Sequence, residues 1–204
     1  MAFVDAFWQP DYVVKSIVKV LFFIGLPVVF YSVIQKKSPQ FLKINIKGLV
    51  VATVLGFFVY AVIVGGYLIT KEFFDYTNIT NALATGVGVD AKNFIFVALY
   101  ISLVNSFLEE FFFRGFAFLE LKKYCHKSIA FCFSSGVFAF YHVAIMVGWY
   151  AWPLFILTMV GLLIGGAMFN LLNEKSQNIY CSWIVHMFAN FGINTIGFIL
   201  FGLI

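Results

Sequence analysis

The sequence predicts an all-α protein, a polytopic transmembrane helix bundle of about six spans, and two observations support this. Hydrophobic residues make up 63% of the 204 residues and charged residues only 11%, whereas soluble domains are about half apolar and about a quarter charged. The apolar residues also gather in runs of about 20, the length at which a helix crosses a hydrocarbon core. The predicted spans are Val13–Gln35, Leu49–Thr70, Asn93–Phe116, Ser128–Val147, Pro153–Asn173 and Ile179–Leu203.

The chain divides into two predicted regions. Residues 1–92 are expected to form a short aromatic segment at the membrane interface, followed by two spans. No basic n-region precedes the first span, so we expect no cleavable signal peptide. Residues 93–204 hold the other four spans and every candidate site residue. In the fifth span, Gly161 and Gly165 have the GxxxG spacing that favours close helix packing.

The net charge of +4 comes from lysines in short loops, which indicates membrane orientation and not nucleic-acid binding. The basic loops contain Lys36, Lys37, Lys43 and Lys47 after the first span, and Lys122, Lys123 and Lys127 after the third. The loop after the second span is acidic on balance. The positive-inside bias therefore places the basic loops in the cytoplasm and both termini outside. Lys15 and Lys19 oppose this bias, and we expect them to snorkel to the outer interface.

Three charged residues fall inside the third span: Glu109, Glu110 and Arg114. A carboxylate at the centre of a membrane helix costs roughly 2.5–3.5 kcal/mol on insertion scales. Glu110 and Arg114 are separated by four residues, lie on one helix face and can form an ion pair. Glu109 points about 100° away and lacks this partner. The hypothesis is that Glu110 and Arg114 are structural and that Glu109 is chemical.

Three further polar residues lie in the later spans. His142 is in the fourth, and His186 and Asn190 share one face of the sixth because they are four residues apart. At 1.5 Å per residue, Glu109 and His186 are both expected about 10 Å from the cytoplasmic edge, with His142 about 20 Å deep. These residues are therefore predicted to share one polar pocket. His126, in a basic loop, is expected to be solvated.

Such a pocket has the groups that peptide hydrolysis requires. Glu109, assisted by His142, can take a proton from water, and protonated Glu109 can return it to the leaving amine. His186 and Asn190 can donate hydrogen bonds to the tetrahedral oxyanion. No serine or cysteine lies beside them in a nucleophile arrangement, which disfavours an acyl-enzyme.

These motifs resemble those of the CPBP (Abi) family, which includes type II CAAX prenyl endopeptidases and bacterial bacteriocin-processing and self-immunity proteins. The family's EExxxR, FxxxH and HxxxN read here as Glu109 to Arg114, Phe138 to His142 and His186 to Asn190, within roughly residues 93–204. The resemblance implies a glutamate-dependent intramembrane endopeptidase that needs no cofactor. Its site would use Glu109, His142, His186 and Asn190, supported by Glu110, Arg114 and Phe138.

The resemblance also implies a peptide or protein substrate and a place in the bilayer. The chain is short beside eukaryotic CAAX proteases, so we expect a bacterial cytoplasmic-membrane protein with its site open toward the cytoplasm. A small peptide or membrane protein is then a better candidate substrate than a prenylated one. Substrate identity and oligomeric state are left open.

Three alternatives stay open at this point. Two histidines and a carboxylate can hold a catalytic zinc ion, although no H-E-x-x-H motif is present. The same fold can serve as a non-catalytic immunity or partner-binding protein. Intramembrane Glu and His can also form the proton relay of a small transporter, although no inverted repeat is visible.

Overall fold

The computed structural model describes residues 12–44, 46–146, 148–149 and 151–204, and all regular secondary structure in this part is helical. The predicted interfacial segment falls almost entirely on residues 1–11, outside the described residues. The first helix comprises α1 (Tyr12–Val20), η2 (Leu21–Gly25), α2 (Leu26–Val29) and η3 (Phe30–Gln35). After the short η4 (Gln40–Leu42) come α3 (Ile46–Thr70) and α4 (Thr77–Val87).

The third long helix is continuous from Phe94 to Lys123. It comprises α5 (Phe94–Leu99), η5 (Tyr100–Asn105), α6 (Ser106–Glu109), η6 (Glu110–Glu120) and η7 (Leu121–Lys123). The turns of η5 and η6 are π-helical, a winding that is often found at functional sites. The chain ends with α7 (Lys127–Met146), α8 (Trp152–Ser176) and α9 (Tyr180–Leu200).

Five of these helices are long and apolar enough to cross a membrane: Ser16–Gln35, Ile46–Thr70, Phe94–Lys123, Trp152–Ser176 and Tyr180–Leu200. They correspond to five of the six predicted spans, and the polytopic helical bundle is therefore confirmed. The remaining predicted span corresponds to the 20-residue helix α7, which is not among the five within the described residues.

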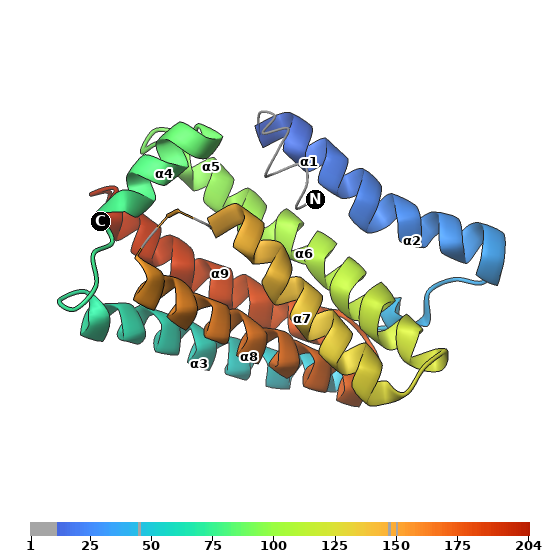
Figure 1. Ribbon diagram of the computed structural model, residues 1–204. Helices are drawn as coiled ribbons and strands as arrows, with labels where there is room; N and C mark the ends of the chain where they lie inside the picture. The colour runs from blue at the N-terminus through green and yellow to red at the C-terminus, as the bar shows by residue number, and fades with distance from the viewer. Residues whose placement is uncertain (1–11, 45, 147, 150) are drawn as a thin grey trace.

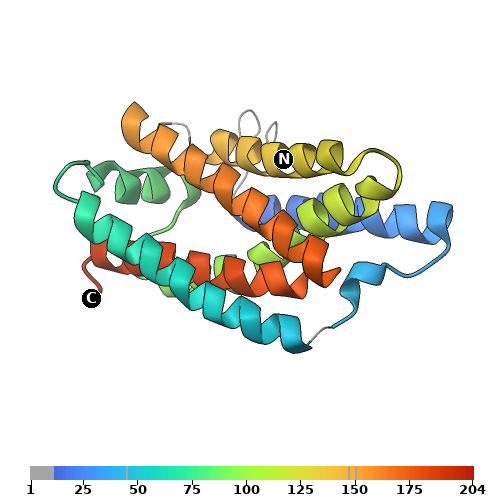
Figure 2. The ribbon, with the colours of Figure 1, turned by 90° about the horizontal axis from the view of Figure 1, so that it is seen from below.

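The helices run lengthwise beside one another, with α9 in the interior (Figure 1). Helix α3 packs along α9, and α7 packs along α8 and against η6. The first helix lies against α6 and η6 through η2, at one side of the bundle (Figures 1 and 2). This arrangement places one face of the third helix between the first helix, α7 and α9.

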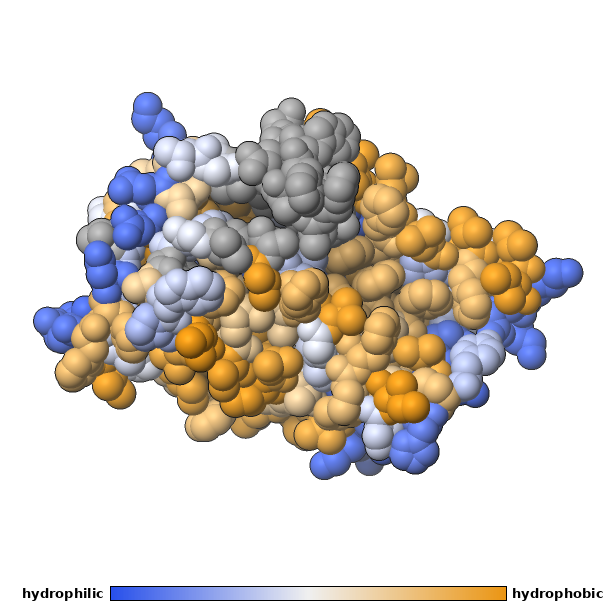
Figure 3. All heavy atoms as spheres, in the orientation of Figure 1, coloured by the Kyte–Doolittle hydropathy of each residue, from blue (hydrophilic) through white to orange (hydrophobic). Residues whose placement is uncertain are grey.

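The surface has the polarity of a membrane protein. Figure 3 shows an apolar band across the middle of the molecule, with hydrophilic residues gathered toward its two ends. The loops after the first and third helices meet at one end, where Gln40, Lys43 and Lys123 line a common pocket. The loops after α3 and α4 lie at the opposite end (Figure 1). The predicted basic loops therefore share one end of the bundle.

The close packing predicted for Gly161 and Gly165 is wrong. Among the described residues, a Cβ atom added at Gly161 or at Gly165 would meet no neighbouring atom within 4 Å. The adjacent Gly166 makes the contact instead, because a Cβ there would lie 3.3 Å from Cα of Ser135 in α7. The spacing alone did not show which face of α8 turns toward the bundle.

Candidate active site

The two glutamates stand at the junction of α6 and η6 and are both buried. Glu109 is 2% exposed and Glu110 is fully buried. Burying one carboxylate is expensive unless the charge is paired and its oxygens are hydrogen-bonded. The charge of each glutamate is paired with a different residue, as expected for neighbours that point in different directions from one helix. One oxygen of each, Oε2, has no hydrogen-bond partner among the described residues.

Glu110 connects an arginine to a histidine. One oxygen, Oε2, lies 3.5 Å from Nε of Arg114, so the predicted ion pair forms. The other oxygen, Oε1, lies 2.9 Å from Nδ1 of His186. The pair is not bidentate, because the guanidinium lies over the Phe138 ring with its carbon 3.9 Å from the ring centroid. A cation above an aromatic face is attracted by the ring quadrupole.

Glu109 has partners that the sequence analysis missed. Lys19 Nζ donates to Glu109 Oε1 at 2.6 Å, and Asn105 Nδ2 donates to the same oxygen at 2.9 Å. The expectation that Lys19 snorkels to the outer interface is therefore wrong: it is 6% exposed and reaches the interior of the bundle. The side chain of Lys15 lies outside the described residues.

The second oxygen of Glu109 faces two imidazole rings. Oε2 lies 3.9 Å from Nε2 of His142 and 3.8 Å from Nε2 of His186. Three helices thus bring Glu109, His142 and His186 together, as predicted. Oε2 has no direct hydrogen-bond partner among the described residues. The two oxygens of Glu109 therefore differ, because one is bonded to donors and the other faces only the histidines.

The far nitrogen of each ring is also held. Nδ1 of His142 lies 2.8 Å from the backbone carbonyl of Phe138. A carbonyl can only accept, so Nδ1 carries the proton, and Nε2 of the neutral ring offers its lone pair toward Glu109. Nδ1 of His186 faces the Glu110 carboxylate in the same way. Contacts of this kind fix both the tautomer and the orientation of an imidazole.

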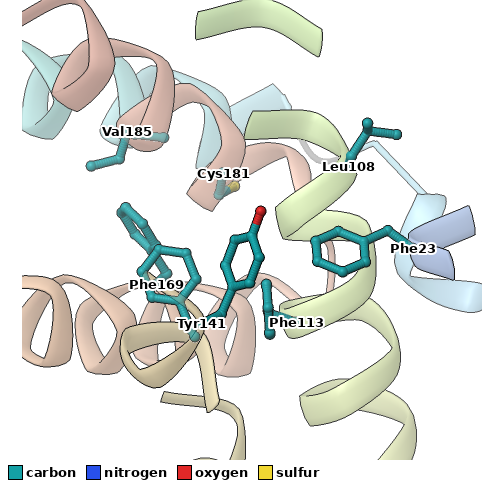
Figure 4. Close-up of a cluster of buried hydrophobic side chains, with 9 residues drawn as sticks. Phe23, Leu108, Phe113, Tyr141, Phe169, Cys181 and Val185 are labelled. Atoms are coloured by element: carbon teal, nitrogen blue, oxygen red, sulfur yellow. The ribbon is translucent and has the colours of Figure 1, made fainter. Parts of the chain in front are cut away.

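An apolar cluster surrounds the rings. Figure 4 shows it as side chains from several helices, among them Phe23, Phe113, Tyr141 and Phe169. The Phe169 ring stacks on the His186 ring, with centroids 5.1 Å apart and an interplanar angle of 26°. The Phe138 ring meets the His142 ring edge-on at 4.7 Å. Low-dielectric surroundings of this kind strengthen each charge interaction at the site.

Asn190 is placed differently from the other candidates. It lies one turn after His186 on α9, and its Nδ2 donates to the backbone carbonyl of Ile101 at 3.2 Å. No side-chain hydrogen bond from Asn190 to Glu109 or to either histidine is seen within the described part of the chain. The amide carries two N–H bonds, so one remains for another acceptor.

Glu109 lies deeper along its helix than predicted, because the helix is longer than predicted. The helix continues to Lys123, seven residues beyond the predicted end at Phe116. Glu109 is 14 residues before Lys123, about 21 Å along the helix, not about 10 Å. His142 is 15 residues into α7, or about 22 Å by the same rise. The site therefore lies near the middle of these two helices.

No group of three or more His, Cys, Asp and Glu side chains in the described part of the chain is arranged to hold a metal ion. Glu109 Oε2 lies beside the two histidine rings, and Lys19 pairs with the other oxygen, Oε1.

Comparison with known proteins gives one match. A family model described as type II CAAX prenyl endopeptidase, Rce1-like, matches residues 91–192, half of the chain. The match includes all three motifs and confirms the family resemblance. No curated protein and no solved structure matches the chain.

Proposed function

Because the chain belongs to the Rce1-like family of type II CAAX prenyl endopeptidases, we propose that it is a glutamate-dependent intramembrane endopeptidase. Membership of the family makes it a protease of the CAAX type, and its apolar helices make it an integral membrane protein. The observation that carries the proposal is the position of Glu109 Oε2 beside Nε2 of His142 and Nε2 of His186.

The first step is the activation of water. Glu109 Oε2 lies 3.9 Å from Nε2 of His142 and 3.8 Å from Nε2 of His186, too far for direct hydrogen bonds. A water molecule placed between these three atoms can hydrogen-bond to each of them at ordinary distances. Glu109 Oε2 takes one proton of this water while Nε2 of His142 accepts a hydrogen bond from the other. The water oxygen then forms a bond to the carbonyl carbon of the scissile peptide.

The second step stabilises the oxyanion. Nδ1 of His186 faces a carboxylate and carries a proton, so Nε2 can donate only when the ring is doubly protonated. In that form its Nε2–H, which lies on the Glu109 side of the ring, would donate the first hydrogen bond to the oxyanion. Asn190 would donate the second hydrogen bond through the N–H that Ile101 does not take. Such donors are worth about 10²–10³ in kcat.

The last step breaks the peptide bond. The tetrahedral intermediate collapses, the C–N bond breaks, and the proton held on Glu109 moves to the leaving amine. The carboxylate is then ionised again and no covalent enzyme intermediate has formed. Arg114 compensates the charge of Glu110 at Oε2 in every step, and Glu110 Oε1 continues to accept the hydrogen bond from His186 Nδ1.

The proposed substrate is a small peptide or a membrane-associated protein, presented from the cytoplasmic side of a bacterial membrane. A prenylated CAAX peptide is the substrate that the family description suggests. A double-glycine leader peptide represents the bacteriocin-processing proteins of the wider family.

The proposal is tested with wild type and Glu109→Gln purified in detergent. Both are incubated with fluorogenic prenylated CAAX and double-glycine leader peptides, with and without chelator. We expect wild type to cut in chelator and Glu109→Gln to be inactive. Activity that disappears in chelator and returns with zinc would favour the metalloprotease. Full cellular function of Glu109→Gln would favour a non-catalytic binding protein.

A further inference from the structure

Glu109 is held by one of its two oxygens. Lys19 Nζ and Asn105 Nδ2 both donate to Oε1, at 2.6 and 2.9 Å. Lys19 Nζ also donates to the side-chain oxygen of Asn105. The three side chains therefore form a closed set of hydrogen bonds. Both hydrogen bonds to the carboxylate go to Oε1, whereas the two histidines lie beside Oε2.

Lys19 is not an ordinary surface counter-ion. Its Nζ lies 5.3 Å from the centroid of the Phe23 ring and 4.9 Å from that of the Tyr141 ring. An ammonium group buried among aromatic rings is unfavourable unless its charge is paired. The residue comes from the first helix, outside the matched residues 91–192. The family motifs therefore do not account for it.

We propose that Lys19 is a positioning residue for the catalytic base. Together with Asn105 it fixes Glu109 Oε1, so that Oε2 faces Nε2 of His142 and Nε2 of His186, where the attacking water would bind. The inference rests on the proposed function. A counter-ion needed only for its charge could contact either oxygen or both, whereas positioning requires donors on the same oxygen, as observed.

The arrangement also directs the proton. After Glu109 accepts a proton from water, Lys19 still occupies Oε1, and an ammonium group can only donate. The proton therefore stays on Oε2, the oxygen that faces the histidines and the leaving amine. Without Lys19, the carboxyl group can rotate and present its proton away from the substrate.

The test compares three variants on the peptide that wild type cuts fastest. Lys19→Met keeps the apolar volume and removes the charge, and Lys19→Arg keeps the charge. Lys123→Met is the matched control, because Lys123 pairs with Glu120 away from the site. We expect Lys19→Met to lower kcat about 10- to 100-fold through misplacement of the base, with KM within about twofold of wild type.

The conservative variant separates positioning from packing. A positioning role predicts that Lys19→Arg retains more kcat than Lys19→Met, whereas a packing role predicts the reverse. If Lys19→Met fails to fold, Asn105→Ala tests the same oxygen, with kcat about 3- to 10-fold lower because one hydrogen bond is lost while Lys19 still donates to Oε1.

Two results would overturn the inference in distinguishable ways. Wild-type kcat in folded Lys19→Met or Asn105→Ala, with Glu109→Gln inactive, would remove the positioning role and leave the proposed function intact. Wild-type activity in Glu109→Gln would remove the proposed function itself, and the positioning role with it.

Discussion

At the scale of single residues, two adjacent glutamates have different partners and therefore different chemistry. Glu110 forms an ion pair with Arg114 through Oε2 and a hydrogen bond with His186 through Oε1. Glu109 keeps one oxygen for the two Nε2 atoms. Helix geometry alone predicts that the two side chains diverge, but only the tertiary contacts show which oxygen is available for reaction.

His142→Asn tests the role of Nε2 separately from that of Nδ1. The asparagine amide can still donate to the Phe138 carbonyl, as Nδ1 of His142 does at 2.8 Å, but it lacks the Nε2 atom that faces Glu109. We expect kcat to fall about 10²- to 10⁴-fold, the usual contribution of acid–base assistance. The measurement is steady-state cleavage in detergent. An unchanged kcat would show that His142 does not assist the base.

Glu110→Gln and Arg114→Met test the supporting ion pair through stability. Each single change leaves one buried charge without its partner, and we expect a loss of about 3–5 kcal/mol in the free energy of unfolding. The double variant removes both charges and should lose less than either single variant. Chemical unfolding in detergent measures all three. Additive losses in the double variant would mean that the pair contributes no coupling.

At the scale of helices, the motifs were predicted well because each lies within a single helix. The i and i+4 spacing places Glu110 with Arg114 and His186 with Asn190, whatever the rest of the fold. The end of the third helix was placed seven residues too early. Its final turns, Ala117 to Lys123, contain Glu120 and two lysines, and these charges end the apolar run from which the span was predicted. In the structure Glu120 is buried and accepts a hydrogen bond from Tyr31, a partner on another helix.

Two glycines with different surroundings test the packing of the helices. A Cβ at Gly56 of α3 would lie 2.5 Å from Cδ2 of Phe188 in α9, whereas one at Gly161 would meet no neighbouring atom within 4 Å in the described part of the chain. We expect Gly56→Val to lower the free energy of unfolding by about 1–3 kcal/mol through overpacking. Gly161→Val, the matched control, should change it by less than about 0.5 kcal/mol. Equal losses would contradict the α3–α9 interface.

At the scale of the whole molecule, Lys19 shows the limit of sequence reasoning. It lies 90 residues before Glu109 in the chain, and no spacing rule connects two residues on different helices. One signal was available, because a lysine six residues inside the predicted span Val13–Gln35 is itself unusual in a membrane helix. Snorkelling to the outer interface gave that lysine another explanation, which the structure contradicts.

The orientation of the bundle is tested by cysteine labelling in intact cells. The native cysteines are first replaced by alanine, and single cysteines are then placed at Lys43 and Asp90, which are both exposed. Lys43 is in the connection between η4 and α3, and Asp90 is in the loop after α4. These two connections lie at opposite ends of the bundle (Figure 1). We expect a membrane-impermeant maleimide to label Asp90→Cys and not Lys43→Cys, since basic loops are retained in the cytoplasm. The reverse pattern would invert the predicted topology.

The central claim is that Glu109 is the catalytic base, and its most direct test uses a matched pair of glutamates. Glu109→Gln and Glu120→Gln each neutralise a carboxylate that is 2% exposed on the same helix, but only Glu109 faces the two histidines. The measurement is the rate of peptide cleavage by each folded variant in chelator, relative to wild type. We predict that Glu109→Gln loses at least about 10³-fold in kcat, while Glu120→Gln stays within about threefold of wild type. Equal activity in the two variants would contradict the account.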